Sequence, residues 1–259
     1  MLRPRIIPCL LVRSKGLVKT VKFGPTKYVG DPINAVKIFN EKEADELIVL
    51  DIDATATGSE PDFAMIQKLA AECRMPLCYG GGIKTVEQAR RIIGLGVEKI
   101  AISSEVISNP NLITEIAAEI GSQSVVVVLD VKKSLFGKYE VYTHNGKKKT
   151  GRTPVEVAQQ AERLGAGEIV INSIDLDGQM TGYDLNLATK IREAIRLPMT
   201  LLGGAGSISD IGSLIQTCGV VGAAAGSLFV FKGVYRAVLI NYPSIVERDN
   251  LVLDSLKGA

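Results

Sequence analysis

The stretch Glu46-Leu-Ile-Val-Leu-Asp-Ile-Asp53 decides the fold, because it recurs as Glu168-Ile-Val-Ile-Asn-Ser-Ile-Asp175 at a distance of 122 residues. Three further pairs repeat at nearly the same distance. They are Tyr79–Ile83 with Leu202–Gly206 and Ser104 with Ser227, each 123 residues apart, and Ile6–Val12 with Val125–Val131, 119 apart. A nearly constant period predicts two similar halves. An open, doubly wound sheet has no reason to repeat in this way.

Eight short apolar runs alternate with helical patterns along the chain. Several runs lack polar alternation, as is typical of strands buried on both faces of a parallel sheet. The expected strands are Ile6–Val12, Leu47–Ile52, Pro76–Tyr79, Lys99–Ile102, Ser124–Val131, Glu168–Asn172, Met199–Leu202 and Val220–Ala224. Between strands, Asn111–Ile120 and Asp184–Arg196 place apolar residues on one helical face, with Asp184 in an N-cap position.

This alternation, together with the internal repeat, predicts an α/β fold. We expect a single (β/α)8 TIM barrel over residues 1–259, built from half-barrels at about 1–122 and 123–259. Two long, basic, glycine-bearing stretches interrupt the rhythm, Arg13–Asp31 and Lys132–Thr153. Both follow the C-terminal end of a strand, where the active-site loops of barrels lie. The second holds His144 and Lys147–Lys149, interpreted either as a solvated loop tip or as a lid over an anionic ligand.

Composition excludes several classes of protein. The 259 residues are 46% hydrophobic and carry a net charge of +2, which implies neither a nucleic-acid footprint nor a membrane-surface face. No apolar run approaches the ~18 residues of a membrane span, and Ile6–Val12 is too short for a signal core. The cysteines lack C-x-x-C spacing, which favours buried, reduced thiols in a cytoplasmic protein; they are Cys9, Cys73, Cys78 and Cys218. With a single histidine, neither a metal nor another cofactor is expected.

Glycine-rich turns follow the third and seventh expected strands, at Gly80-Gly81-Gly82 and Gly203-Gly204-Ala205-Gly206. Such a turn lets the backbone approach an anion closely, and the following helix offers free N–H groups. Ser103-Ser104 and Gly226-Ser227, after strands four and eight, complete each pair. The alternative is plain turn chemistry, but two sites at one offset favour a long ligand with a phosphate at each end.

Carboxylates stand at the upper ends of the strands, where acid–base chemistry is expected; they are Asp51, Asp53, Asp130, Asp175 and Asp177. Asp130 closes an apolar strand, and a carboxylate is costly to bury there without a task or a partner. A structural cap on a neighbouring loop is the alternative interpretation. The residue that corresponds to Asp130 in the first strand is Leu11, so a two-carboxylate mechanism would lack one member.

Four charged residues stand just before or at the start of strands, at the opposite, lower mouth: Arg5, Glu46, Lys99 and Glu168. Two cations and two anions there could form a ring around the barrel axis. Ordinary surface ion pairs, which contribute little stability each, are an equally good interpretation of the spacing alone.

A set of motifs spread over essentially the whole chain resembles the cyclase subunit of imidazole glycerol phosphate synthase. The motifs are Arg5–Leu10, Gly30–Pro32, Asp45–Leu47, Gly80–Ile83, Asn109-Pro110, Gly121–Gln123, Lys147-Lys148, Thr150-Gly151, Gly165–Glu168, Ser173–Asp175, Asp177-Gly178, Gly182–Asp184 and Gly203–Gly206.

The resemblance implies a glutamine amidotransferase. A separate glutaminase subunit would dock on the lower face and release ammonia, which travels up the barrel to a bisphosphorylated ribulosyl substrate of histidine biosynthesis. The products would be imidazole glycerol phosphate and aminoimidazole carboxamide ribotide. By the same resemblance, the ammonia gate is formed by Arg5, Glu46, Lys99 and Glu168.

The resemblance also assigns the upper rim. Asp130 matches one of two catalytic aspartates, and Lys19 and Asp51 match substrate-contacting positions. The phosphate sites map onto Gly82, Ser103 and Ser104, and onto Asp177, Gly178, Gly204 and Ser227.

The chain departs from the family pattern at the first catalytic aspartate, which is Leu11 here, and at Ser103-Ser104 and Leu176. Loss of one acid or base typically costs about 10²- to 10⁴-fold in rate. A paralogous branch that is similar serves bacterial surface-polysaccharide (lipopolysaccharide) synthesis, in which a barrel and a glutaminase supply ammonia to a separate sugar-amidating ligase.

Three hypotheses follow from the sequence. The favoured one is an ammonia-conducting barrel of that amidino-sugar branch. The second is an authentic cyclase that replaces the missing acid with another carboxylate such as Asp51. The third is a non-catalytic scaffold that binds a phosphorylated ligand.

Overall fold

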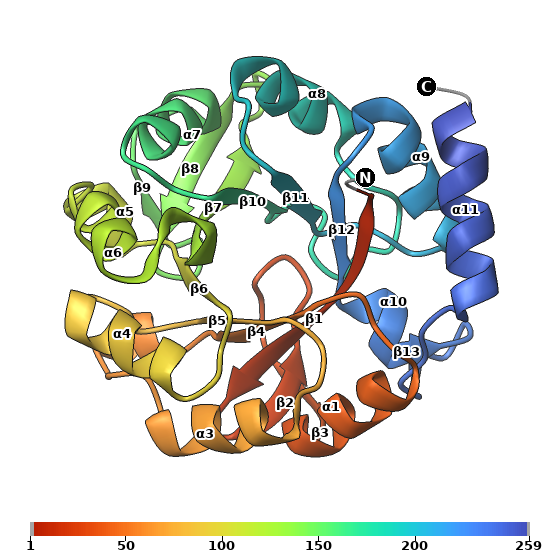
Figure 1. The fold of residues 1–259 in the computed structure, drawn as a ribbon. Coiled ribbons are helices and arrows are strands. Elements are labelled where there is room, and N and C mark those ends of the chain that lie inside the picture. Colours follow the sequence, from red (N-terminus) through yellow and green to blue (C-terminus); the bar gives the residue numbers. More distant parts are fainter. Residues whose placement is uncertain (1–2, 258–259) are drawn as a thin grey trace.

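The computed structural model describes residues 3–257, which form a closed, eight-stranded parallel barrel (Figure 1). Each barrel strand pairs with the next, and the last pairs with the first, so the barrel sheet is closed. The (β/α)8 prediction is confirmed. The strands are β1 (Arg5–Arg13), β4 (Leu47–Asp51), β5 (Leu77–Gly80), β6 (Lys99–Ile102), β7 (Val125–Lys133), β10 (Glu168–Ser173), β11 (Met199–Leu202) and β12 (Gly222–Ala225).

Amphipathic helices surround the barrel, and Asp184 caps one of them as predicted. The Asp184 carboxylate accepts a hydrogen bond from the Leu187 amide at 3.0 Å, which satisfies a free N–H at the helix start. The outer helices are α1 (Pro32–Glu41), α3 (Phe63–Glu72), α4 (Val86–Gly94), α6 (Leu112–Ile120), α7 (Pro154–Arg163), α8 (Leu185–Ala194), α9 (Ile208–Cys218) and α11 (Ile245–Lys257).

Side-chain alternation along the strands divides the core into two layers. On β1, Ile6 and Leu10 belong to the layer between sheet and helices, whereas Ile7 and Cys9 belong to a smaller cluster enclosed by the barrel. Val126, Val128 and other residues from the remaining strands complete the enclosed cluster, and Leu11 packs against it. The inner face of β1 therefore presents Arg5, Ile7, Cys9 and Leu11 in order along the barrel axis.

The two long stretches that interrupt the repeat fold as hairpins beyond the barrel strands. The first holds β2 (Gly16–Lys19) and β3 (Lys27–Gly30), and β2 pairs antiparallel with β1. The second holds β8 (Tyr139–Thr143) and β9 (Lys148–Lys149), which continue from β7. The shorter remaining elements are α2 (Ala54–Thr57), α5 (Glu105–Ser108), η1 (Ser122–Ser124), α10 (Ser227–Val230), β13 (Phe231–Lys232) and β14 (Ala237–Val238).

The boundaries of the eight barrel strands agree with the predicted ones to within two residues. All four cysteines are free, but only Cys9 and Cys78 are buried, and Cys73 and Cys218 are half-buried. Within residues 3–257, every helix is too short or too polar to span a lipid bilayer. The division into half-barrels near residue 122 stays a prediction.

One glycine between α7 and β10 is fixed by close backbone packing. A Cβ at Gly167 would lie 2.1 Å from the Ser122 carbonyl oxygen, so Gly167→Ala forces the backbone to move. We expect it to lower the free energy of unfolding by about 1–3 kcal/mol in urea titrations. Gly94→Ala is the control, because a Cβ there meets nothing within 4 Å on helix α4. It is expected to raise stability by up to about 1 kcal/mol. Equal effects of the two exchanges would contradict this packing.

Candidate functional site

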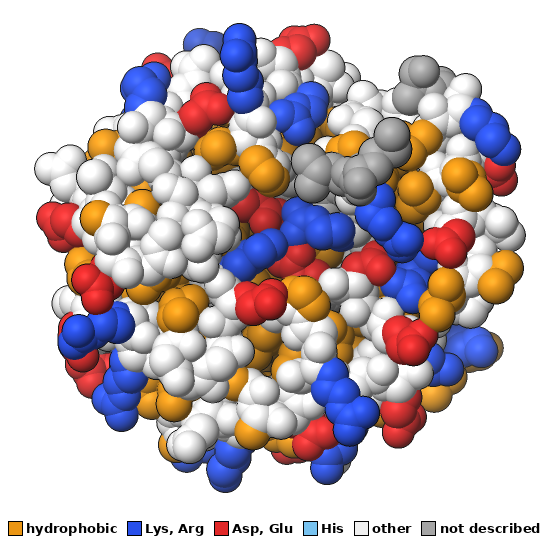
Figure 2. All heavy atoms as spheres, viewed as in Figure 1, with side chains coloured by type: hydrophobic (Ala, Val, Ile, Leu, Met, Phe, Trp, Pro, Cys, Tyr) orange, Lys and Arg blue, Asp and Glu red, His pale blue; other side chains and the backbone are white. Residues whose placement is uncertain are grey.

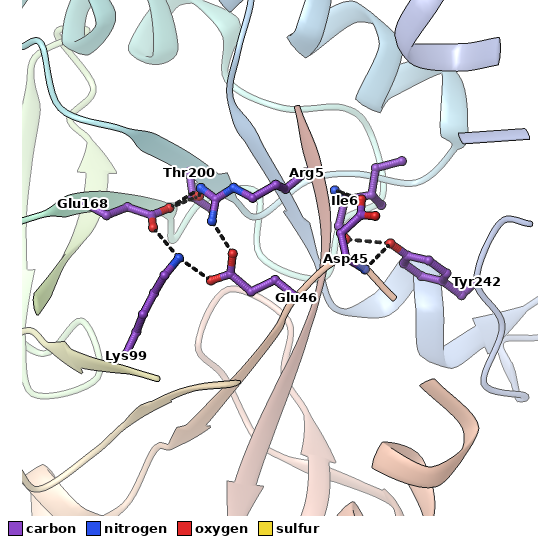
Figure 3. Close-up of polar contacts among 8 residues, drawn as sticks. All are labelled: Arg5, Ile6, Asp45, Glu46, Lys99, Glu168, Thr200 and Tyr242. Atoms are coloured by element: carbon purple, nitrogen blue, oxygen red, sulfur yellow. Dashed lines mark hydrogen bonds and ion pairs between the residues drawn. The ribbon is translucent and has the colours of Figure 1, made fainter. Parts of the chain in front are cut away.

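The four charged residues at the start of the strands form a closed ring of ion pairs at the lower mouth (Figure 3). Lys99 Nζ lies 2.8 Å from Glu46 Oε1 and 2.9 Å from Glu168 Oε2. Arg5 closes the ring, at 2.7 Å from Glu168 and in direct contact with Glu46. We call these four residues the ion-pair ring. Figure 2 shows blue and red side chains gathered at the centre of this face.

Burial makes the ion-pair ring more than a set of surface pairs. Glu46 and Glu168 are 3% and 5% exposed, so each carboxylate requires its partners. Burial alone would raise the pKa of Glu168, but the charges of Arg5 and Lys99 outweigh it and hold that pKa below its usual value. The same carboxylates raise the pKa of Arg5 and Lys99 against the opposing effect of burial. Arg5, Lys99 and Glu168 are therefore held in their charged forms.

Thr200 on β11 joins this ring, although the sequence analysis did not select it. Its hydroxyl donates to Glu168 Oε1 at 2.6 Å, and the residue is fully buried. The available signal was a single hydroxyl in the otherwise apolar strand Met199–Leu202. Thr200 supplies Glu168 with a hydrogen bond that neither cation provides.

A second network ties the C-terminal part of the chain to the strands that carry the ring (Figure 3). The Tyr242 hydroxyl donates to the Ile6 carbonyl oxygen at 2.7 Å and accepts from the Asp45 amide at 3.2 Å. The Asp45 carboxylate accepts from the Ile6 amide at 2.9 Å and contacts Arg248 of α11. Ile6 and Asp45 are chain neighbours of Arg5 and Glu46, so this network fixes the backbone beneath the ring.

The upper mouth opens into a cavity of about 580 Å³, to which all eight barrel strands contribute residues. We call it the upper pocket. The structure brings to its wall every upper-rim residue that the resemblance assigns. They are Lys19, Asp51, Gly82, Ser103, Ser104, Asp130, Asp177, Gly178, Gly204 and Ser227, together with Leu11. The structure shows that these residues line one pocket, and the roles assigned to them stay predictions.

Leu11 and Asp130 enter the upper pocket from β1 and β7, which are four strands apart in the closed barrel and so lie on opposite sides. Asp130 accepts hydrogen bonds from Asn172 Nδ2 at 3.0 Å and from Ser103 Oγ at 3.4 Å. Burial raises the pKa of Asp130 to about 6, although these two hydrogen bonds favour the charged form. A carboxyl group with such a pKa can exchange a proton near neutral pH.

The other carboxylates differ in their surroundings. Asp51 accepts from the amides of Asp53 and Ala54 at 3.0 and 3.1 Å, and burial raises its pKa. Asp177 accepts from Thr20 Oγ1 at 2.7 Å and from the Phe23 amide at 3.1 Å, which holds the first long loop over the rim. Asp53 forms an ion pair with Arg13.

Asp175 is absent from the wall of the upper pocket. It accepts from the Lys133 amide at 2.7 Å, so it caps a loop and does not join the site.

Two glycine turns carry the predicted phosphate sites. Gly82 and Gly204 have φ of +74° and +109°, values that L side chains rarely adopt. A Cβ at Gly204 would lie 2.0 Å from the Gly182 carbonyl oxygen, so that turn packs directly on another loop. Beside the turns, α5 and α10 start at Ser104 and Gly226 without a side-chain cap. Backbone carbonyls serve part of these first turns: the Val106 and Ile107 amides donate to the Ser103 and Ser104 carbonyl oxygens, and the Phe229 amide donates to the Gly226 carbonyl oxygen.

The turn between β8 and β9 reaches across the mouth to other loops. Asn145 Nδ2 donates to the Ile52 carbonyl oxygen at 2.7 Å, and the His144 amide donates to Ser104 Oγ at 3.2 Å. Asn145 and Lys147 line the upper pocket, whereas Lys148 and Lys149 form the short strand β9. Of the two interpretations of this turn, its placement favours a cover over part of the mouth.

Comparisons with known proteins identify the family of the chain. The model of the histidine biosynthesis protein family matches residues 5–236. A Vibrio vulnificus protein provisionally named imidazole glycerol phosphate synthase subunit hisF3 is 61% identical over 249 residues, 96% of each chain. A Pseudomonas aeruginosa protein provisionally named subunit hisF2 is 51% identical over 96% of this chain and 99% of its own. Imidazole glycerol phosphate synthase subunit HisF of Alkaliphilus metalliredigens is 41% identical over 90% of this chain and 93% of its own.

The raised pKa of Asp130 predicts a specific dependence of stability on pH. Between the ordinary aspartate pKa of about 4 and the folded value of about 6, the folded state binds more protons than the unfolded state. Stability contributed at this site is therefore present at low pH and lost as pH rises through that window. Asp130→Asn removes the loss, so the variant should gain up to about 3 kcal/mol relative to the unmodified chain between pH 4 and 7.

The measurement is urea unfolding of both proteins across that pH range. Asp254→Asn is the control for loss of one carboxylate, because Asp254 lies exposed on α11. A stability difference between Asp130→Asn and the unmodified chain that stays constant from pH 4 to 7 would show that Asp130 titrates normally.

Proposed function

Because the chain belongs to the histidine biosynthesis protein family, among the cyclase subunits of imidazole glycerol phosphate synthase, we propose that it is the ammonia-conducting barrel of a glutamine amidotransferase. A glutaminase subunit docks on the lower face and releases ammonia at the ion-pair ring. Ammonia reaches the upper pocket and serves a separate ligase that amidates a surface-polysaccharide sugar. We place the chain in the cytoplasm, where such precursors are made.

The observation that carries the proposal is the pairing of a complete ring with an incomplete acid–base pair. All four members of the ring are present and in contact. At the upper mouth, Asp130 faces Leu11, which can neither take nor give a proton. A barrel that still transfers ammonia has to keep the ion-pair ring. A barrel that no longer cyclises a substrate can carry a leucine at position 11.

The barrel interior supports passage of a neutral molecule. Between ring and pocket lie the enclosed apolar residues, among them Ile7, Cys9 and Cys78. An apolar lining disfavours a charged ammonium ion far more than neutral ammonia. Lys99 reaches both carboxylates through a flexible stem, so it is the member of the ring that can move aside with the least change of the backbone.

The upper pocket supports binding of a phosphorylated ligand. The glycine turns at Gly82 and Gly204 stand on the two halves of the rim, and a turn of this kind lets the backbone approach an anion closely. We assign Ser103 and Ser104 to one phosphate cradle, and Asp177, Gly178 and Ser227 to the other.

An authentic cyclase is the second candidate, and the position of Asp51 favours it. Asp51 lines the upper pocket from β4, the strand next to β1, and its pKa is raised by burial. Its Oδ1 already accepts two backbone amides, which ties that oxygen to the loop.

Leu11→Asp separates the two candidates. With ammonium salt and the bisphosphorylated ribulosyl substrate, we expect Leu11→Asp to cyclise about 10²- to 10⁴-fold faster than the unmodified chain, because it restores the second proton-transferring group. Leu11→Asn is the matched control, since it adds polarity of the same size without an ionisable group. If the unmodified chain already cyclises the substrate, and Leu11→Asp is no faster, the ligase-serving proposal is wrong and the cyclase candidate stands.

Ammonia transfer has a test of its own in the assembled system of barrel, glutaminase and ligase. Glu168→Gln should lower glutamine-dependent amidation about tenfold or more, the effect of ~1.4 kcal/mol, and leave amidation from added ammonium salt unchanged. The reason is that Glu168 contacts both cations of the ring. Glu87→Gln is the control, on an exposed ion pair of α4. If glutamine-dependent amidation is equally fast with and without the barrel, the barrel does not conduct ammonia. Of the three hypotheses, the non-catalytic scaffold would then be favoured.

A further inference from the structure

Lys19 is a buried amine on the wall of the upper pocket with one hydrogen-bond partner. The residue is 5% exposed, and its Nζ donates to the Cys9 carbonyl oxygen at 2.7 Å. Among the residues that the structure describes, no carboxylate lies within ion-pair distance of Nζ. An ammonium group has three donors, so two positions on Nζ remain for a molecule in the pocket.

The chain makes room for this amine. Nζ lies 2.2 Å from the point that a Cβ would occupy at Gly226, so any larger residue there would push the amine out of this position. Leu11 lies on β1 next to β2, paired with Val18, the residue before Lys19. The inner face of β1 therefore supplies a leucine, and not an anion, near the amine.

A buried amine without a carboxylate is poorly suited to permanent positive charge. Burial lowers the pKa of Lys19, and the electrostatic effects of Cys9 and, more weakly, of Asp177 oppose the shift only in part. Asp177 itself is engaged with Thr20 and Phe23. The neutral form of a lysine amine is a nucleophile, and its characteristic reaction is with a carbonyl group.

We propose that Lys19 is a carbonyl-reactive amine, which holds an open-chain phosphorylated aldehyde or ketone in the upper pocket as an imine. The phosphate end of that ligand rests on the cradles of the proposed function. The covalent step rests only on Lys19 and on the shape of the pocket.

The step is balanced without any further reagent. The Nζ lone pair attacks the carbonyl carbon, a C–N bond forms, and the amine proton passes to the carbonyl oxygen. The resulting hydroxyl takes up the second amine proton and leaves as water while the nitrogen forms the C=N bond, so amine plus carbonyl gives imine plus water. Asp130 stands in the same pocket with a carboxyl group able to carry that proton. Ammonia that arrives from below can displace Lys19 from the imine and free the amine again.

The test uses pyridoxal 5′-phosphate as a phosphorylated aldehyde. The unmodified chain is incubated with it, reduced with borohydride, digested, and analysed by mass spectrometry. We expect the reduced adduct on Lys19 at higher occupancy than on any other lysine. Pyridoxal without the phosphate should label Lys19 about tenfold less, the effect of ~1.4 kcal/mol of phosphate binding.

Lys147→Met is the matched control, because Lys147 lines the same pocket but is exposed. It should keep the adduct on Lys19, whereas Lys19→Arg should lose it and retain a donor. The decisive measurement is made on the unmodified chain, so it does not depend on how a variant folds. An unlabelled Lys19 beside labelled surface lysines overturns the proposal. Since the assay contains neither glutaminase nor ligase, its failure leaves the ammonia-transfer proposal standing.

Discussion

Closure of the parallel sheet is the constraint on which the rest of the molecule depends. Because the barrel has no edge, alternate residues of each strand must point inward for its whole length. On β1 this places a ring cation, two apolar lining residues and Leu11 on one line from the lower mouth to the upper. The different chemistry of the two mouths and the apolar layer between them are thus consequences of one strand's alternation.

Burial gives the two mouths opposite electrostatic character. At the lower mouth, each buried carboxylate meets two cations, so the cost of removing it from water is offset by short, multiple contacts. At the upper mouth, Lys19 is buried and Asp130 is half-buried, and neither has the other or any further ion partner within contact distance in residues 3–257. Their pKa values shift towards neutrality in consequence. The lower site keeps its charges fixed, while the upper site is arranged for proton exchange.

The sequence predicts the barrel well because its signals are periodic. Apolar runs and the repeat at about 122 residues need no knowledge of contacts, and the strands they indicate are the strands that form. Motifs at strand ends are equally accessible, since the C-terminal ends of parallel strands meet at one rim. Hence four of the five strand-end carboxylates, all except Asp175, lie around one pocket.

What the sequence could not predict depends on contacts between distant residues. Thr200 looks like an ordinary strand residue until Glu168 is seen beside it. Asp175 resembles the other strand-end carboxylates, yet a loop amide engages it outside the pocket. The position of Lys19 in the sequence does not predict that its amine donates to the Cys9 carbonyl oxygen alone, or that Gly226 leaves space beside it. Tyr242 contacts Ile6 at the base of β1 from 236 residues away, and Arg248 contacts Asp45 from 203 residues away, beyond any local pattern.

The way the chain enters the barrel bears on how the protein is handled at the bench. Arg3 forms ion pairs with Asp45 and Asp249, and Arg5, two residues later, is already part of the ring. Any affinity tag fused ahead of Arg3 therefore begins at the rim of the face where a second subunit would sit. A fusion at the other end follows α11, which lies at the periphery of the barrel (Figure 1). Purification handles placed there leave the entrance to the barrel clear.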